Sequence, residues 1–184
     1  MLFGGKKKKL QRIMEILSDD VKALYKINRK YSFTNDSMFD DYNKFYFNTA
    51  VFMNFNYMNA CREVYKNDKK VFTTFHTSLQ TLVSNMSKDK EMFNQLNQAA
   101  FTGYEYFIEK HKEISEQTKA GSKDFYDSLA CLYITSVNDQ EKLEEYIDTE
   151  EFSKFINDIS NYIREAIKKI IDEDILLWQL IKDQ

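Results

Sequence analysis

The chain has 184 residues, of which 43% are hydrophobic and 30% charged, with four glycines, no proline and a formal net charge of −3. An average chain of this length would contain about nine prolines. Because sandwiches and barrels need many tight turns built from Gly, Pro and Asn-Gly pairs, this composition predicts helices and argues against a β-rich fold.

The length fits one domain with a core of its own. We expect a flexible basic tip over residues 1–9 and a helical bundle domain over residues 10–184. The two cysteines, Cys61 and Cys131, share no short spacing with each other or with a histidine, so they predict reduced thiols. With no apolar run of about 18 residues and no signal-peptide core, the expected location is cytoplasmic, including the cytoplasmic face of a membrane.

Apolar residues recur at helical spacing from residue 10 onward. The first stripe runs from Leu10 to Tyr31 and ends before the capping residues between Thr34 and Ser37. The second begins at Phe39 and is apolar on nearly every side. Such a helix is typical of the centre of a bundle or of a surface that meets a partner.

The remaining stripes continue the same pattern to the end of the chain. Several step by alternating threes and fours, which is the spacing of long helices packed side by side as in coiled coils. The fold class is therefore all-α, a single bundle of about five to seven mostly long antiparallel amphipathic helices. These later stripes occupy residues 72–86, 93–114, 125–136, a short acidic segment at 143–147, and 152–181.

Capping residues mark several boundaries between these helices. Gly121 is expected to end one helix, and Ser122 to begin the next. Thr149, followed by Glu150 and Glu151, is expected to begin the last helix, because carboxylates favour the positive end of a helix.

Motifs of catalysis or metal binding are missing from the sequence. It contains no pair of Glu-x-x-His segments, no His-Glu-x-x-His, no phosphate-binding Gly-rich loop and no Gly-x-Ser-x-Gly. We therefore expect a protein without enzymatic activity, bound metal or cofactor. A site assembled from distant helices would leave no such local trace.

His111 is the more informative of the two histidines. Its position falls on the stripe that includes Phe107 and Ile114, so we expect it to face inward. The common explanation is a histidine satisfied within the core. The alternative is a pocket for a flat apolar ligand or cofactor, lined by Tyr104 and Phe107 with His111 as its polar contact.

Nucleic acid is not an expected partner. The sequence is acidic overall, and residues 36–60, where aromatic residues are densest, contain Lys44 as their single basic residue. Stacking on single strands needs aromatic residues between cations, and phosphate binding needs cations.

The first twelve residues contain five basic and no acidic side chains, whereas the rest of the chain has 21 basic and 29 acidic ones. Lysines near an anionic bilayer contribute about 1 kcal/mol each, so this segment is a candidate membrane contact. The alternative is a disordered tail that keeps the protein in solution. The candidate membrane-binding residues are Leu2, Phe3, Lys6, Lys7, Lys8, Lys9 and Arg12.

The C-terminal stretch after Asp172-Glu173-Asp174 is apolar in almost every direction. Either it is wedged between several helices or it belongs to an interface, where Trp is a frequent anchor. Together with the all-round apolar second helix, it predicts self-association, with a symmetric homodimer as the default form. The candidate interface residues are Leu176, Leu177, Trp178, Leu180 and Ile181.

These features together predict a helical interaction or scaffold protein that self-associates and attaches to an anionic membrane through its basic N-terminus. Its long amphipathic helices and basic start are similar, in organisation only, to the membrane-shaping helical dimers of the BAR type. The alternatives are the ligand-binding bundle described above and a regulator that binds another protein, such as an immunity protein.

Overall fold

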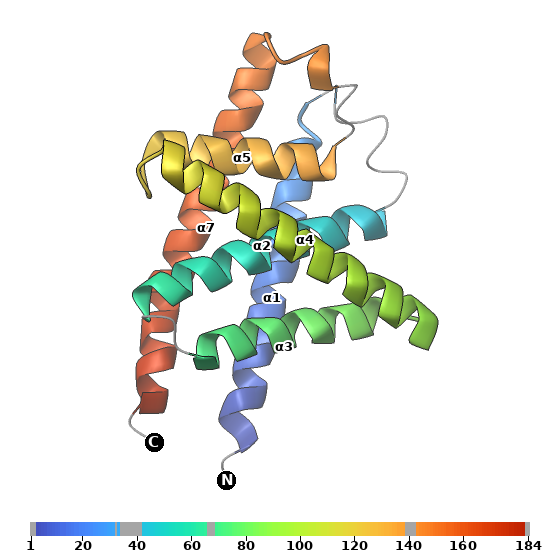
Figure 1. Cartoon of the computed structure of the whole chain (residues 1–184), viewed down its shortest axis with the longest axis vertical. Helices are drawn as coiled ribbons and strands as arrows, with labels where there is room; N and C mark the ends of the chain where they lie inside the picture. Colours follow the sequence, from blue (N-terminus) through green and yellow to red (C-terminus); the bar gives the residue numbers. More distant parts are fainter. Residues whose placement is uncertain (1–2, 32, 34–41, 66–68, 139–142, 183–184) are drawn as a thin grey trace.

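The computed structural model describes residues 3–31, 33, 42–65, 69–138 and 143–182, and within these ranges the side chains from residue 10 to residue 172. Over these ranges the chain forms an all-α bundle of six long helices without a strand, which confirms the predicted fold class (Figure 1). The helices are α1 (Phe3–Asn28), α2 (Tyr42–Val64), α3 (Lys69–Met86), α4 (Lys90–Gln117), α5 (Lys123–Val137) and α7 (Glu150–Lys182).

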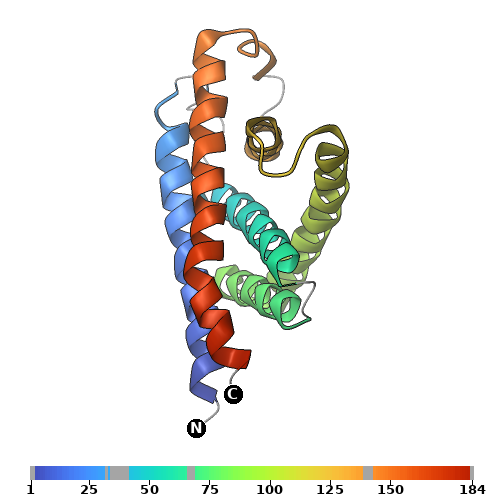
Figure 2. The ribbon, with the colours of Figure 1, turned by 90° about the vertical axis from the view of Figure 1, so that its left-hand side faces the viewer.

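The two outermost helices in the sequence, α1 and α7, lie side by side and run in opposite directions (Figures 1 and 2). The helices between them, α2 to α5, cross this pair, and each runs back against the one before it. The start of α1 and the end of α7 consequently lie at the same end of the molecule.

Helix α2 is the centre of the core. It contacts α1, α3, α4, α5 and α7, and its apolar residues are covered on nearly every side. The structure therefore places the second apolar segment in the middle of the bundle, so this helix no longer supports the predicted self-association. Its buried residues are Phe45, Phe47, Thr49, Ala50, Val51, Phe52, Met53, Asn54, Phe55, Asn56, Tyr57, Met58 and Cys61.

Helix α4 lies on the outside and packs through a narrow strip. Of its 28 residues, all within the described part of the chain, Ala100 and Phe107 are the buried ones. Gly103 lets the helix approach α2 closely, because a Cβ atom there would lie 3.3 Å from Cγ1 of Val51. The outer face of α4 leaves Phe101 58% exposed and Ile108 57% exposed.

The ends of the helices follow the predicted capping residues in part. Ser122 caps α5, since its Oγ accepts a hydrogen bond from the backbone N–H of Phe125 at 3.2 Å. Gly121 does not end α4 as expected. That helix ends at Gln117, where the backbone N–H of Thr118 donates to the Ile114 carbonyl, and Gly121 lies in the following turn with a φ of 78°.

Helix α1 begins earlier than the pattern of apolar residues indicates. Its helical backbone starts at Phe3 and includes Gly4 and Gly5, whereas the predicted stripe starts at Leu10. Helix α7 begins after Thr149, whose Oγ1 accepts from the Phe152 N–H at 3.1 Å, and it continues for 33 residues as the long final stripe predicts.

Candidate functional site

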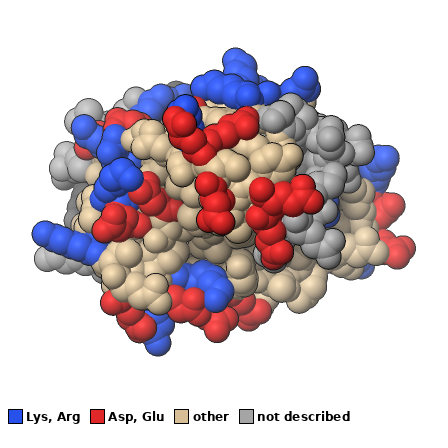
Figure 3. Space-filling view, turned by 90° about the horizontal axis from the view of Figure 1, so that it is seen from above, with Lys and Arg blue, Asp and Glu red and all other residues tan. Residues whose placement is uncertain are grey.

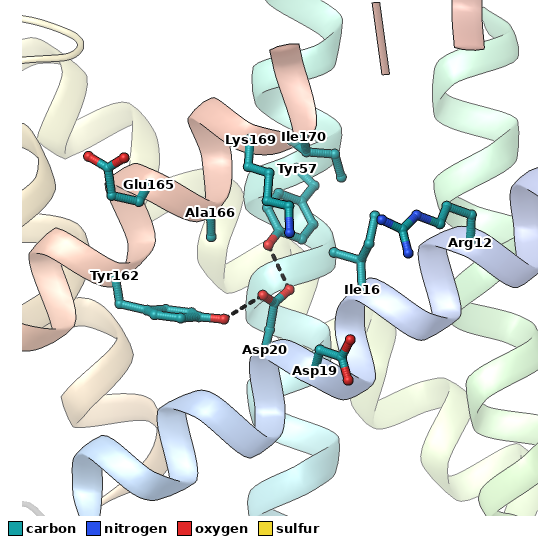
Figure 4. A pocket seen from close by; sticks show the side chains of 10 residues that line it. All are labelled: Arg12, Ile16, Asp19, Asp20, Tyr57, Tyr162, Glu165, Ala166, Lys169 and Ile170. Atoms are coloured by element: carbon teal, nitrogen blue, oxygen red, sulfur yellow. Dashed lines mark hydrogen bonds between the residues drawn. The ribbon is translucent and has the colours of Figure 1, made fainter. Parts of the chain in front are cut away.

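A buried carboxylate joins three helices at the middle of the molecule. Asp20 of α1 is 5% exposed, and the hydroxyl of Tyr57 on α2 donates to its Oδ2 at 2.6 Å. The hydroxyl of Tyr162 on α7 donates to the other oxygen, Oδ1, at 2.7 Å (Figure 4). Asp20 therefore links α1 to both the central helix and the C-terminal helix.

Burial and hydrogen bonding act in opposite directions on this carboxyl. Desolvation raises the pKa of Asp20, while the hydrogen bonds from Tyr57 and Tyr162 stabilise its ionised form and reduce the increase. The charge of Asp19 adds to the increase, and that of Lys169 opposes it. Burial also raises the pKa of both tyrosines, so their hydroxyls remain protonated donors.

A pocket of about 240 Å³ opens beside this carboxylate between α1 and α7 (Figure 4). Charges of both signs surround it, with Arg12 and Lys169 against Asp19 and Glu165. Since each oxygen of Asp20 accepts a hydrogen bond from a tyrosine hydroxyl on a different helix, the arrangement is suited to holding the three helices together.

Sequence reasoning missed Asp20, although a signal was present. It follows Leu17 by three residues and precedes Leu24 by four, and both leucines are fully buried. An acidic residue at this spacing lies within the apolar stripe and must find hydrogen-bond donors in the core. The donors come from residues 37 and 142 positions away, so no local pattern identifies them.

All three residues of the predicted ligand pocket pack against the ring of Phe55 on α2, with centroid distances of 5.6 Å for Tyr104, 5.7 Å for Phe107 and 6.0 Å for His111. Phe107 is buried between the rings of Phe52 and Phe55, at centroid distances of 5.3 and 5.7 Å. The Tyr104 hydroxyl donates to Oδ1 of Asn54. Both side chains therefore belong to the contact between α4 and α2, and neither lines a described pocket.

His111 alone of the three reaches a pocket, as a half-buried side chain. Its ring meets those of Phe55 and Phe125 edge to face, and Nδ1 lies 3.4 Å from Oγ of Ser115. Burial lowers the pKa of His111, while the charge of Glu63 opposes this change. Both His111 and Glu63 line a pocket of about 240 Å³ between α2, α5 and α7.

For most of the predicted membrane-binding residues the structure describes the backbone at most. Leu2 is outside the described residues, and for Phe3 and Lys6 to Lys9 the structure gives a helical backbone in α1 without the side chains. The side chain of Arg12 is described. Its Nη1 lies 3.6 Å from Oε2 of Glu15, and the side chain lines the pocket beside Asp20.

The structure likewise describes the backbone of the predicted interface residues and not their side chains. The backbone of α7 continues through residues 176–181, which include Leu176, Leu177, Trp178, Leu180 and Ile181, and the described side chains end at residue 172. Their role in an interface therefore stays a prediction.

Among the described residues, no group of three or more His, Cys, Asp or Glu side chains is placed to hold a metal ion. None of the helices in the described part of the chain is long and apolar enough to cross a membrane.

Comparison with known proteins gave no match to a family model, to a curated protein or to a solved structure.

Proposed function

We propose that this chain is a non-enzymatic helical interaction protein that attaches to an anionic membrane surface through the end where α1 begins and α7 ends. The observation that supports this proposal is the antiparallel pairing of these helices (Figure 2). It brings the lysine run at residues 6–9 to the same end as the apolar run at residues 175–181.

The register of the two helices follows from the pocket between them. Arg12 and Ile16 of α1 line it together with Lys169 and Ile170 of α7. Continuing both helices toward their ends pairs the turn that contains residues 6–9 with the turns after residue 172. Cations beside a Trp- and Leu-rich segment supply the two kinds of interaction that hold a peripheral protein at a bilayer.

The opposite end of the molecule has a different charge. Figure 3, which views that end, shows acidic side chains spread across its middle and basic side chains mainly along its edges. Exposed acidic residues gather there around the start of α7: Glu144, Glu145, Asp148, Glu150 and Glu151. An anionic membrane would repel this end. The long axis of the molecule would then point away from the bilayer surface, with the acidic end farthest from the lipid.

Sedimentation with vesicles tests the attachment. The wild-type protein is expected to sediment with phosphatidylserine-containing liposomes at low salt and to be released above about 0.3 M salt, because screening weakens exposed charge contacts. Replacing Lys6 to Lys9 with glutamine removes about 1 kcal/mol per lysine, which predicts a loss of affinity of roughly 1,000-fold.

A matched control replaces four exposed lysines elsewhere with glutamine and is expected to retain most of the binding. A suitable set is Lys69, Lys70, Lys90 and Lys119. Trp178→Ala is expected to weaken binding without changing its salt dependence, because it removes an apolar contact. Equal sedimentation of wild type and the residue 6–9 variant would contradict the attachment and leave the lysines as a solubilising segment.

We also propose that the protein self-associates when it is free in solution, through the same apolar residues of α7 around Trp178 that a bilayer would cover in the attached state. The exposed Phe101 and Ile108 on α4 supply a further apolar surface for a protein partner. Light scattering over a concentration series should show a dimer that Trp178→Ala weakens about 30-fold. A monomeric wild type at tens of micromolar would contradict the dimer.

A further inference from the structure

The start of α2, the end of α3 and the start of α4 lie together on one side of the molecule (Figure 1). Residues from these three helix ends line a groove, together with Met14 of α1, and its volume is about 810 Å³. None of the described residues that line it belongs to α5 or α7. The groove shares no lining residue with the Asp20 pocket.

The lining of the groove is mainly apolar. Aromatic residues come from α2, and three methionines come from α1, α3 and the start of α4. Methionine side chains are flexible and adapt to an apolar guest, and the volume lies within the range of about 300–1,000 Å³ that is usual for ligand sites. The apolar lining residues are Met14, Tyr42, Tyr46, Phe47, Leu82, Met86, Met92, Leu96 and Ala99.

The charged side chains of the groove are of one sign. Lys44 and Lys88 line it, together with the amides of Asn43, Asn48 and Asn85, and no carboxylate is among the described lining residues. In a protein with a net charge of −3, such a lining favours a guest that is apolar along its length and anionic at one end.

We propose that this groove binds a long-chain fatty acid, with the hydrocarbon chain against the methionines and aromatic rings and the carboxylate toward Lys88. The volume, the apolar lining and the single sign of charge among the described lining residues all favour this class of ligand. The proposal does not depend on attachment to a membrane, and its test uses no vesicles.

Titration calorimetry of the full chain with oleate, below the concentration at which oleate forms micelles, tests the proposal. We expect one oleate per chain. Ala99 is exposed on α4 and lines the groove, so Ala99→Trp fills the groove without disturbing the core and should weaken oleate binding at least about tenfold. Gln98→Trp, at the exposed neighbour outside the lining, is the matched control and should bind as the wild type does.

A second pair of variants tests the carboxylate. Lys88→Gln should weaken oleate binding about fivefold and leave the binding of oleyl alcohol unchanged, whereas Lys90→Gln, outside the groove, should change neither. Absence of oleate binding, or equal binding by the Ala99→Trp variant, would overturn the proposal. So would a dimer that Ala99→Trp dissociates while oleate has no effect, since a second copy would then occupy the groove.

Discussion

Phe52→Ala is expected to lower the free energy of unfolding by about 3–5 kcal/mol, the usual cost of truncating a fully buried aromatic residue. The Phe52 side chain is 0% exposed at the centre of α2. Its ring lies 5.3 Å from that of Phe107 on α4 and 5.2 Å from that of Tyr133 on α5, measured between centroids. Urea denaturation followed by circular dichroism measures the loss.

The matched control is the same substitution on the surface. Phe101 is 58% exposed, so Phe101→Ala should change the stability by no more than about 0.5 kcal/mol. A loss below about 1 kcal/mol for Phe52→Ala would show that α2 is not the centre of the core.

Asp20→Ala is expected to cost about 2–4 kcal/mol of stability, because it leaves the hydroxyls of Tyr57 and Tyr162 without their acceptor. Asp19→Ala is the control. This neighbouring carboxylate is exposed, and its Oδ1 lies 3.2 Å from Nζ of Lys22. Because exposed ion pairs contribute little, its removal should change the stability by about 0.5 kcal/mol or less. Equal effects of the two substitutions would contradict a structural role for Asp20.

Asp20→Asn tests the pH dependence that follows from burial. The pKa of Asp20 is raised in the folded protein, so the folded state binds the proton more tightly than the unfolded chain does. The stability that this proton contributes is fully present below the unfolded pKa and is lost as the pH rises through the folded pKa. The variant should therefore lose stability relative to wild type as the pH is lowered from about 7 to about 4.

Unfolding free energies of both proteins at a series of pH values measure this difference. Glu109→Gln, at an exposed carboxylate on α4 that is not among the groups acting on the pKa of Asp20, should show no comparable trend. A difference that stays constant, or that changes in the opposite direction, would contradict the raised pKa of Asp20.

The helices could be predicted from the sequence because their signals are local. Stripes of apolar residues repeat within a few turns, and Ser122 and Thr149 act on backbone groups three residues away. The inward position of His111 follows from the same periodicity, and the structure places it half-buried against Phe55 and Phe125.

The candidate sites could be predicted only in part, because their components come from distant segments. Tyr104 and Phe107 were correctly expected on the inner face of their helix, but periodicity does not distinguish a core contact from the wall of a pocket. The Asp20 site was missed because one of its two donors lies 142 residues away.

The sequence by itself determined that this protein is an all-α bundle, where most of its helices run and which of their faces are apolar. These properties depend on interactions between residues three or four positions apart. Only the tertiary structure decided that α2 is the centre, that the lysine run and the apolar C-terminal turns share one end, and that Asp20 is held by two tyrosines. Each of these depends on how helices far apart in the chain pack together, and this packing is decided by the burial of the whole apolar surface at once.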